Sequence, residues 1–595
     1  MAGSIDPVEL ASRLSEKQMD CWLHMESETP LNKYPAKQHA RRVATELGVS
    51  AGLLILHGEI ARNNKYSDMP APFRQNRYFY YLTGCNETDC HVTYDIEQDS
   101  LSLYIPKVDT SRIIWYGRGS TIPEALDKYD VDYVHHNERL QHHTDRYLRD
   151  YPGVLYLLDP KECSQIIRPD DKRCDVQSLL PAMNRARVIK DQHEIDLIRK
   201  ANKISSQAHV EVLANIRKFT NEAQVEGRFL DVCVSNHARK QAYDIIAGSG
   251  PNAGTLHYDA NNEDFGDRLL MCLDAGCEWQ NYASDITRTF PLTGKWTKEG
   301  RAIYGLVERM QSYCIEKLRP GVRYLDLHIQ AHQIAIEGLL KLGILHNGTP
   351  EEIYKAGTSR AFFPHGLGHH IGLEVHDVGH SELMSGLSTA EKEVPSLFPQ
   401  DYHLSVYDPA LCFAPATPRS GPLQEGMVLT VEPGIYFSAY ALKLYSKHPV
   451  HRKYINVPVL KKYMSVGGVR IEDDILITRD GHENLTTAPK GEAMLRIING
   501  EETPDLDAIC SSASSPQRST VAPQLTEENE EKEESLVPAP GISRSRLCLR
   551  CRVYRASHNT DCSEDSHSYE QMKIPIRRSE SIGLNFLQRG EGSRR

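Results

Sequence analysis

The sequence predicts a protein of the α/β (α+β) class with two folded domains and a C-terminal tail. Helix-type and strand-type hydrophobic patterns alternate from about residue 34 to 185 and again from 186 to 500, and they stop near Gly500. The chain has 595 residues, which is too long for a single core. We therefore expect an N-terminal extension (1–33), an α/β domain (34–185), a larger second domain (186–500) and a low-complexity, disordered tail (501–595).

The composition is that of an ordinary globular protein, with 40% hydrophobic and 25% charged residues. The net charge of −11 is modest for this length and gives no reason to expect binding to nucleic acid or to a membrane surface. The sequence contains no run of about 18 apolar residues, so no membrane span is predicted. The polar start lacks the apolar stretch of a secretory signal, and the fourteen cysteines show no spacing pattern. Both observations favour reduced thiols and a cytoplasmic location.

The first domain shows one clear helix and several strands. Residues 36–47 place apolar side chains at helical spacing. Residues 52–57 form a continuous apolar run, 100–105 alternate between apolar and polar, and 154–158 are again apolar, so each predicts a strand.

Residues 73–84 combine aromatic side chains with arginines. One interpretation is a surface that faces an active site or a second subunit. The other is ordinary packing inside the domain, which we favour because aromatic side chains mostly bury apolar area.

The second domain is expected to follow a linker that ends near Arg187. Asp191 and Glu194 form a capping box at the start of its first helix. Four predicted strands each carry an acidic residue: 269–274, 282–290, 427–432 and 468–477. The polar stretch between Asp377 and Gln424 is expected to be an excursion on the surface.

Residues 363–377 contain four histidines, three glycines and two carboxylates. Glycine at this density predicts sharp turns or close backbone approach, and imidazole beside carboxylate is typical of metal or proton-transfer sites. Five side chains in the second domain interrupt apolar strands or this glycine-rich segment: Asp274, Asp285, His369, Glu432 and Glu472.

A carboxylate is costly to bury unless a cation compensates for the lost hydration. Five such positions in one domain therefore suggest a shared site for two divalent ions, with some of the carboxylates bridging both ions. The alternative is a set of unrelated, separately paired acids, and spacing alone leaves both interpretations open.

These motifs resemble one known family. Segments 274–276, 285–290, 365–369, 431–436 and 469–472 are similar, in order, to motifs of the metallopeptidases with the pita-bread fold, which include aminopeptidase P, prolidase and methionine aminopeptidase. The resemblance covers about 35–490. The first domain resembles the creatinase-type domain of the proline-directed members, which methionine aminopeptidases lack.

The resemblance implies a role for each candidate residue. Asp274 would hold one metal, His369 and Glu432 the other, and Asp285 and Glu472 would bridge both. The cofactors would be two divalent metal ions per subunit, and oxygen-rich ligands with a single imidazole favour Mn²⁺. Glu432 would also handle a proton. His257, His365 and His376 would contact the substrate and stabilise the oxyanion, and Arg470 would orient the carboxylates.

The implied function is an Xaa-Pro aminopeptidase, a dinuclear-metal exopeptidase that removes the N-terminal residue from peptides with proline in the second position. Its partners would be proline-containing peptides and a second copy of the chain, docked through the N-terminal domain as a homodimer. Prolidase, which cleaves Xaa-Pro dipeptides, stays open, because the 40 residues from Glu432 to Glu472 resemble that branch. A metal-free pita-bread binding module is a further alternative.

The tail contains the acidic run 527–534 and a basic, serine-rich end. Cys548, Cys551, His558 and Cys562 could form a zinc knuckle, but a second ligand pair at the usual spacing is missing. An unstructured tail is the favoured interpretation.

Overall fold

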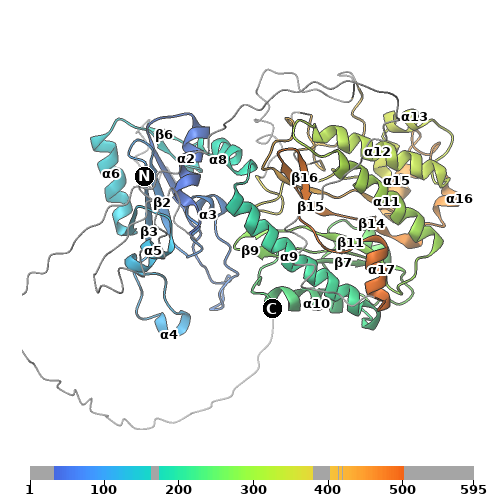
Figure 1. Cartoon of the computed structure of the whole chain (residues 1–595), viewed down its shortest axis with the longest axis horizontal. Coiled ribbons are helices and arrows are strands. Elements are labelled where there is room, and N and C mark those ends of the chain that lie inside the picture. Colours follow the sequence, from blue (N-terminus) through green and yellow to red (C-terminus); the bar gives the residue numbers. More distant parts are fainter. Residues whose placement is uncertain are drawn as a thin grey trace, which may run out of the picture. The chain divides into compact units, whose positions relative to one another are not determined.

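The structure is a computed structural model that describes residues 33–161, 173–378, 398, 402–412, 415–418 and 420–501 (Figure 1). The predictions for the N-terminal extension, the disordered tail and the zinc knuckle lie outside these residues. The greater part of the expected surface excursion before Gln424 lies outside them as well.

The N-terminal domain is built on a six-stranded sheet with the order β4-β3-β2-β1-β5-β6. The three central strands pair antiparallel, whereas β4, β5 and β6 pair parallel to their neighbours. The strands are β1 (Leu53–His57), β2 (His91–Asp95), β3 (Ser100–Ile105), β4 (Tyr133–His136), β5 (Leu155–Tyr156) and β6 (Cys174–Asp175). The helices of this domain are α2 (Ala36–Leu47), α3 (Arg77–Thr83), α4 (Ile113–Tyr116), α5 (Ile122–Lys128) and α6 (Glu138–Asp150).

The predicted helix over 36–47 is confirmed with the same bounds, and its apolar face is buried in the domain core, where α3 packs beside it. The aromatic segment is confirmed as a packing element, since Phe79, Tyr80 and Tyr81 of α3 are buried in the domain core. The expected linker is largely helical, because α8 (Leu179–Val188) occupies it.

The second domain starts with α9 (Gln192–Asn215), and the capping box of Asp191 and Glu194 is present at its N-terminus. The other helices are α10 (Glu222–Ser235), α11 (Lys298–Lys317), α12 (Tyr324–Lys341), α13 (Pro350–Lys355), α15 (Ala439–Lys447), α16 (Val457–Leu460) and α17 (Gly491–Asn499). Short 3₁₀ turns cover Ile216–Lys218, Gly250–Gly254, Thr358–Ala361 and Met464–Val466.

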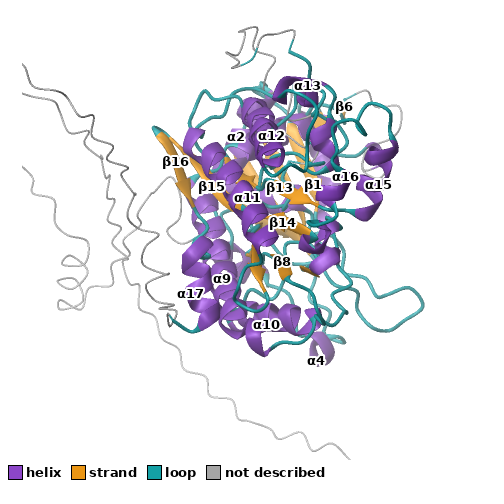
Figure 2. Cartoon of the chain, turned by 90° about the vertical axis from the view of Figure 1, so that its right-hand side faces the viewer, coloured by secondary structure: helices purple, strands orange, loops and turns teal. Residues whose placement is uncertain are grey.

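The strands of this domain form small antiparallel sheets with the orders β11-β8-β7, β12-β15-β16, β13-β14 and β10-β9. Helix α11 lies in front of β13 and β14 in Figure 2 and contacts β12, β13 and β14, and α12 packs against α11. The strands are β7 (Ile246–Ser249), β8 (Leu270–Asp274), β9 (Glu278–Trp279), β10 (Tyr282–Ala283), β11 (Thr287–Pro291), β12 (Val428–Val431), β13 (Gly434–Tyr436), β14 (Gly468–Arg470), β15 (Asp473–Thr478) and β16 (Gly481–Asn484).

Two strands that the sequence predicts as continuous are broken, each at a candidate ligand. Asp285 lies in the gap between β10 and β11, and its backbone N–H donates to the Asp474 carboxylate instead of to a neighbouring strand. Glu472 lies between β14 and β15 and forms an isolated bridge to Thr287. At both breaks, therefore, segments that belong to different small sheets hydrogen-bond to one another.

None of the described helices combines the length and the apolar run that a bilayer crossing needs.

Candidate metal centre

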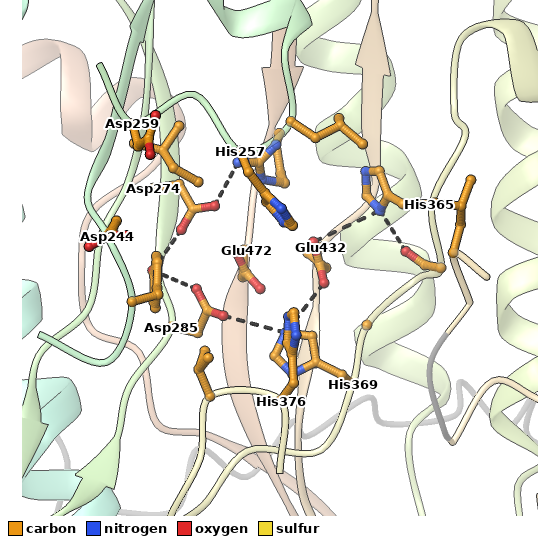
Figure 3. A pocket seen from close by; sticks show the side chains of 18 of the residues that line it. Asp244, His257, Asp259, Asp274, Asp285, His365, His369, His376, Glu432 and Glu472 are labelled. Atoms are coloured by element: carbon orange, nitrogen blue, oxygen red, sulfur yellow. Dashed lines mark hydrogen bonds and ion pairs between the residues drawn. The ribbon is translucent and has the colours of Figure 1, made fainter. Parts of the chain in front are cut away.

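Five strand ends and loops bring the candidate ligands together (Figure 3). Asp274 is the last residue of β8, and Thr287 of β11 pairs opposite it, which places Asp285 nearby. Glu432 directly follows β12. His369 lies in a loop held to β12, since the Thr430 backbone N–H donates to the His369 carbonyl at 2.8 Å.

The glycine beside His369 is required by this close approach. A Cβ atom at Gly368 would lie 2.2 Å from the Thr430 carbonyl oxygen and 2.6 Å from the Tyr324 hydroxyl. Any side chain at Gly368 would therefore push the His369 loop away from β12.

The ligand atoms converge within a few ångströms. His369 Nε2 lies 3.4 Å from Asp285 Oδ2 and 3.5 Å from Glu432 Oε1. Asp285, His369 and Glu472, all three buried, each offer one ligand atom, and these atoms lie within 4.8 Å of one another. Asp274 is joined to Asp285 through the hydroxyl of Tyr243, which lies 2.6 Å from an oxygen of each carboxylate.

The centre holds more negative charge than its side chains neutralise. Burial, together with the charges of Asp285, Glu432 and Asp274, raises the pKa of Glu472 well above its ordinary value. Burial also raises the pKa of Glu432, to about 7. Burial alone would lower the pKa of His369, but its hydrogen bond with Asp285 and the charges of Glu432 and Asp285 raise it to about 9.

Among the described residues, Glu472 Oε1 is buried and has no hydrogen-bond partner. Glu472 is one of four carboxylates in this centre, and an unpaired oxygen on one of them fits a bound cation. The donor set of carboxylate oxygens and one imidazole suits a hard or borderline divalent ion. The residues present therefore fit a divalent metal site.

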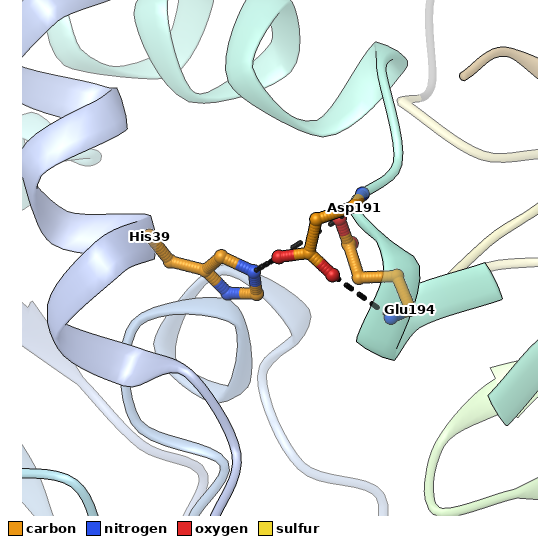
Figure 4. Close-up of side chains that lie close together, drawn as sticks. All are labelled: His39, Asp191 and Glu194. Carbon is orange, nitrogen blue, oxygen red and sulfur yellow. Dashed lines mark hydrogen bonds and ion pairs between the residues drawn. The ribbon is translucent and has the colours of Figure 1, made fainter. Parts of the chain in front are cut away.

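A second group of metal-type ligands does not pass the same test (Figure 4). His39, Asp191 and Glu194 also bring ligand atoms within 4.8 Å of one another. Here the carboxylates are already paired: Asp191 accepts from the Glu194 backbone and from His39, and Glu194 accepts from the Asp191 backbone and from Tyr282. This group is the capping box of α9, joined to α2 through His39.

Arg470 and Thr287 hold the carboxylates in place. Arg470 donates to Asp274 at 2.6 Å, to the Tyr436 hydroxyl at 2.8 Å and to Thr287 Oγ1 at 3.1 Å. Thr287 Oγ1 in turn donates to Glu472 at 2.7 Å.

The three other predicted histidines lie around the same cavity of about 500 Å³, together with the five candidate ligands and Arg470. His365 bonds to the Tyr436 hydroxyl at 2.8 Å, and its Nδ1 lies 3.9 Å from Glu432. The His376 ring lies 4.3 Å from the His369 ring, centroid to centroid, and His257 is exposed at the rim. Burial lowers the pKa values of His365 and His376 to about 3, so both imidazoles are neutral near pH 7.

Two residues of the site, Tyr243 and Thr287, were not predicted from the sequence. Thr287 could have been found, because it is two residues after Asp285 at the start of a strand, where alternate side chains face the same side. Tyr243 belongs to no predicted element, and no local signal marks it.

Sequence models of two known domains match the chain. The model described as metallopeptidase family M24 matches residues 196–479, and the model described as aminopeptidase P, N-terminal domain, matches residues 36–156. A probable Xaa-Pro aminopeptidase of Pyrenophora tritici-repentis is 58% identical over 552 residues, which cover 91% of this chain and 82% of the relative. The chain belongs to metallopeptidase family M24.

Other relatives of this M24 chain carry the same name. A probable Xaa-Pro aminopeptidase of Pyrenophora teres f. teres is 59% identical over 91% of this chain, although the chain spans only 58% of that relative's length. One from Aspergillus clavatus is 53% identical, with 78% of this chain and 93% of the relative covered.

Solved structures of the same kind confirm the predicted fold. The low-pH form of Escherichia coli aminopeptidase P has a TM-score of 0.63 at 28% identity, covering 79% of this chain and 99% of the other. Proline aminopeptidase P II of Yersinia pestis has a TM-score of 0.61 at 28% identity, covering 78% and 99%. The N-terminal domain followed by a pita-bread metallopeptidase domain is thus confirmed.

Proposed function

We propose that this M24 chain is an Xaa-Pro aminopeptidase, which hydrolyses the bond between the N-terminal residue and a proline in second position. One observation carries the proposal: four carboxylates and one imidazole converge on a buried, under-neutralised centre that opens into a cavity. The aminopeptidase P-type N-terminal domain and the names of the relatives support the proline-directed branch.

The proposed metal ligands are Asp274, Asp285, His369, Glu432 and Glu472. The two cations, for which we propose Mn²⁺, would supply activation of water and polarisation of the scissile carbonyl. The unpaired Glu472 oxygen and the central position of Asp285 support these two as the ligands shared by both cations.

The chain's own residues would bind and orient the substrate and move its protons. Glu432 borders the cavity with a raised pKa, which suits a carboxylate that takes up and returns a proton. His376 is a neutral imidazole whose N–H group can donate to an oxygen that gains negative charge. The single N–H of neutral His365 is donated to the Gly366 carbonyl at 2.7 Å, so we propose that this ring contacts the substrate without donating to that oxygen. We propose that His257 at the rim contacts the substrate and that Arg470 keeps Asp274 and Thr287 in position.

Two alternatives compete with this proposal. Prolidase would use the same centre on dipeptides. A binding module without metal is disfavoured, because none of the five ligand positions is replaced by an apolar residue.

The test compares Gly-Pro with Arg-Pro-Pro as substrates, after chelation and refilling with Mn²⁺. We expect cleavage of Arg-Pro-Pro that disappears with the chelator and returns with the metal. Cleavage of Gly-Pro alone would change the assignment to prolidase. Cleavage of neither peptide by metal-loaded protein would favour the binding module.

Two further expectations stay proposals. We expect a homodimer docked through the N-terminal domain, and sedimentation that shows only monomer at working concentration would contradict it. We also propose a cytoplasmic location, which imaging of the tagged full-length protein in its own cells would test.

A further inference from the structure

His376 lies in a loop that forms part of the cavity wall and is closed by two backbone hydrogen bonds. The Asp377 backbone N–H donates to the His370 carbonyl at 2.9 Å, and the Gly372 N–H donates to the Glu374 carbonyl at 3.1 Å. Gly372 has no room for a side chain, since a Cβ there would lie 2.5 Å from Asp377 Oδ2. Within this loop, Val375 and His376 line the cavity.

Ion pairs fix the loop on both sides of His376. On one side, the buried Asp377 carboxylate binds Arg187 at 2.6 Å and Lys190 at 2.8 Å. On the other side, Glu374 binds Arg74 at 2.7 Å and Arg77 at 3.2 Å. His376 is therefore held between two anchored carboxylates.

The arginines that hold Glu374 come from the N-terminal domain. Arg77, at the start of α3, is buried and also donates to Glu278 at 2.5 Å and to Asn281 at 2.8 Å. Arg74 binds Glu278 as well, at 2.8 Å. Because both guanidinium groups are also held by these other contacts, Glu374 binds two arginines whose positions are already fixed.

We propose that Glu374 is a positioning residue, through which the N-terminal domain fixes His376 over the metal centre. It is not among the residues that line the cavity, and it acts through Val375, the one residue that separates it from His376 in the loop. This proposal rests on the proposed function, because it assumes that His376 contacts the substrate during Xaa-Pro hydrolysis.

The test uses Glu374→Gln, which keeps the size of the side chain and removes its charge. The matched control is Glu483→Gln, which breaks a comparable ion pair with Arg199 at 2.7 Å between α9 and β16. The side chains of Glu374 and Glu483 are 38% and 31% exposed, so both variants should fold. We expect Glu374→Gln to lower kcat on Arg-Pro-Pro by about 10-fold or more with little change in KM, because small misplacement of a catalytic group is costly. Glu483→Gln should change kcat by less than about twofold.

A double-mutant cycle separates positioning from general destabilisation. If Glu374 acts through His376, Glu374→Gln combined with His376→Ala should be no slower than His376→Ala alone. If the losses of kcat in the two single variants multiply in the double variant, or if Glu374→Gln leaves kcat unchanged, the proposal is overturned.

A second readout needs no activity. The ring signals of His376, identified in NMR spectra by their loss in His376→Ala, should shift in Glu374→Gln and stay in place in Glu483→Gln. An unshifted His376 signal would overturn the positioning role. A wild-type protein that cleaves no Xaa-Pro peptide would instead contradict the proposed function, while the NMR comparison would still decide whether Glu374 positions His376.

Discussion

The side chain of Glu432 lies half-buried beside His369 and Asp285, and burial raises its pKa to about 7. The pKa values of Glu472 and Asp274 are raised as well. Among the described residues, Arg470 is the one arginine that contacts these acids, through its hydrogen bond to Asp274. At the residue scale, the centre is therefore strained by its own charge, and a divalent cation would relieve that strain.

Replacing Asp285, one of the two ligands proposed to be shared by both cations, should abolish activity without unfolding the protein. For Asp285→Asn we expect a fall in kcat of at least about 100-fold, since even groups that only orient a ligand contribute 10–100-fold. Circular dichroism should stay unchanged while bound metal decreases. Appreciable turnover in this variant would remove Asp285 from the metal centre.

Tyr243 offers a milder change at the same place. Tyr243→Phe removes the hydroxyl that bonds to both Asp274 and Asp285. Because it orients two proposed ligands, we expect metal affinity to fall by about 10–100-fold, as measured by titration with Mn²⁺. Unchanged affinity would show that the two carboxylates keep their positions without it.

The charge of the centre also predicts how pH affects the metal-free protein. The pKa of Glu432 is raised to about 7 and that of His369 to about 9. Both groups bind protons more tightly in the folded than in the unfolded state, so their contribution to stability is lost as pH rises through these values. Above about pH 6.5 the buried histidines with lowered pKa values, such as His365 and His376, are neutral in both the folded and the unfolded state. From there to about pH 9 we expect the free energy of unfolding of chelated protein to fall.

Denaturant titrations at several pH values measure this trend. Added Mn²⁺ should remove it, because metal binding replaces the protons and strengthens as pH rises. A metal-free protein whose stability rises over the same range would contradict the assigned charge pattern.

At the scale of the elements, breaks in the strands create the site. The sequence predicts the strands that carry Asp274 and Glu432 almost to the residue, because each is a short apolar run that ends in an acid. It does not predict the interruptions at Asp285 and Glu472. Those depend on the bond from the Asp285 backbone to Asp474 and on the bridge from Thr287 to Glu472, between segments more than 180 residues apart.

The close contact between the His369 loop and β12 can be tested at Gly368. We expect Gly368→Ala to destabilise the protein by about 1–3 kcal/mol, because its Cβ would overlap the Thr430 carbonyl. Gly305→Ala, in an open position on α11, is the control and should stabilise by up to about 1 kcal/mol. Equal stability of the two variants in denaturant would contradict the packing described.

At the scale of the whole molecule, the N-terminal domain supplies no candidate ligand, yet its Arg74 and Arg77 reach the loop that carries His376. The sequence located this domain and its aromatic segment, and the motifs located every candidate ligand. The ion pairs between the two domains were missed, because Glu374 and the arginines are about 300 positions apart and each reads locally as a surface charge.

The central claim is that Asp274, Asp285, His369, Glu432 and Glu472 together hold two divalent ions. Anomalous diffraction from crystals loaded with Mn²⁺ tests it most directly. The account predicts two manganese peaks among these five side chains, with Asp285 and Glu472 between them. A single peak, or peaks elsewhere with these carboxylates left unliganded, would contradict it.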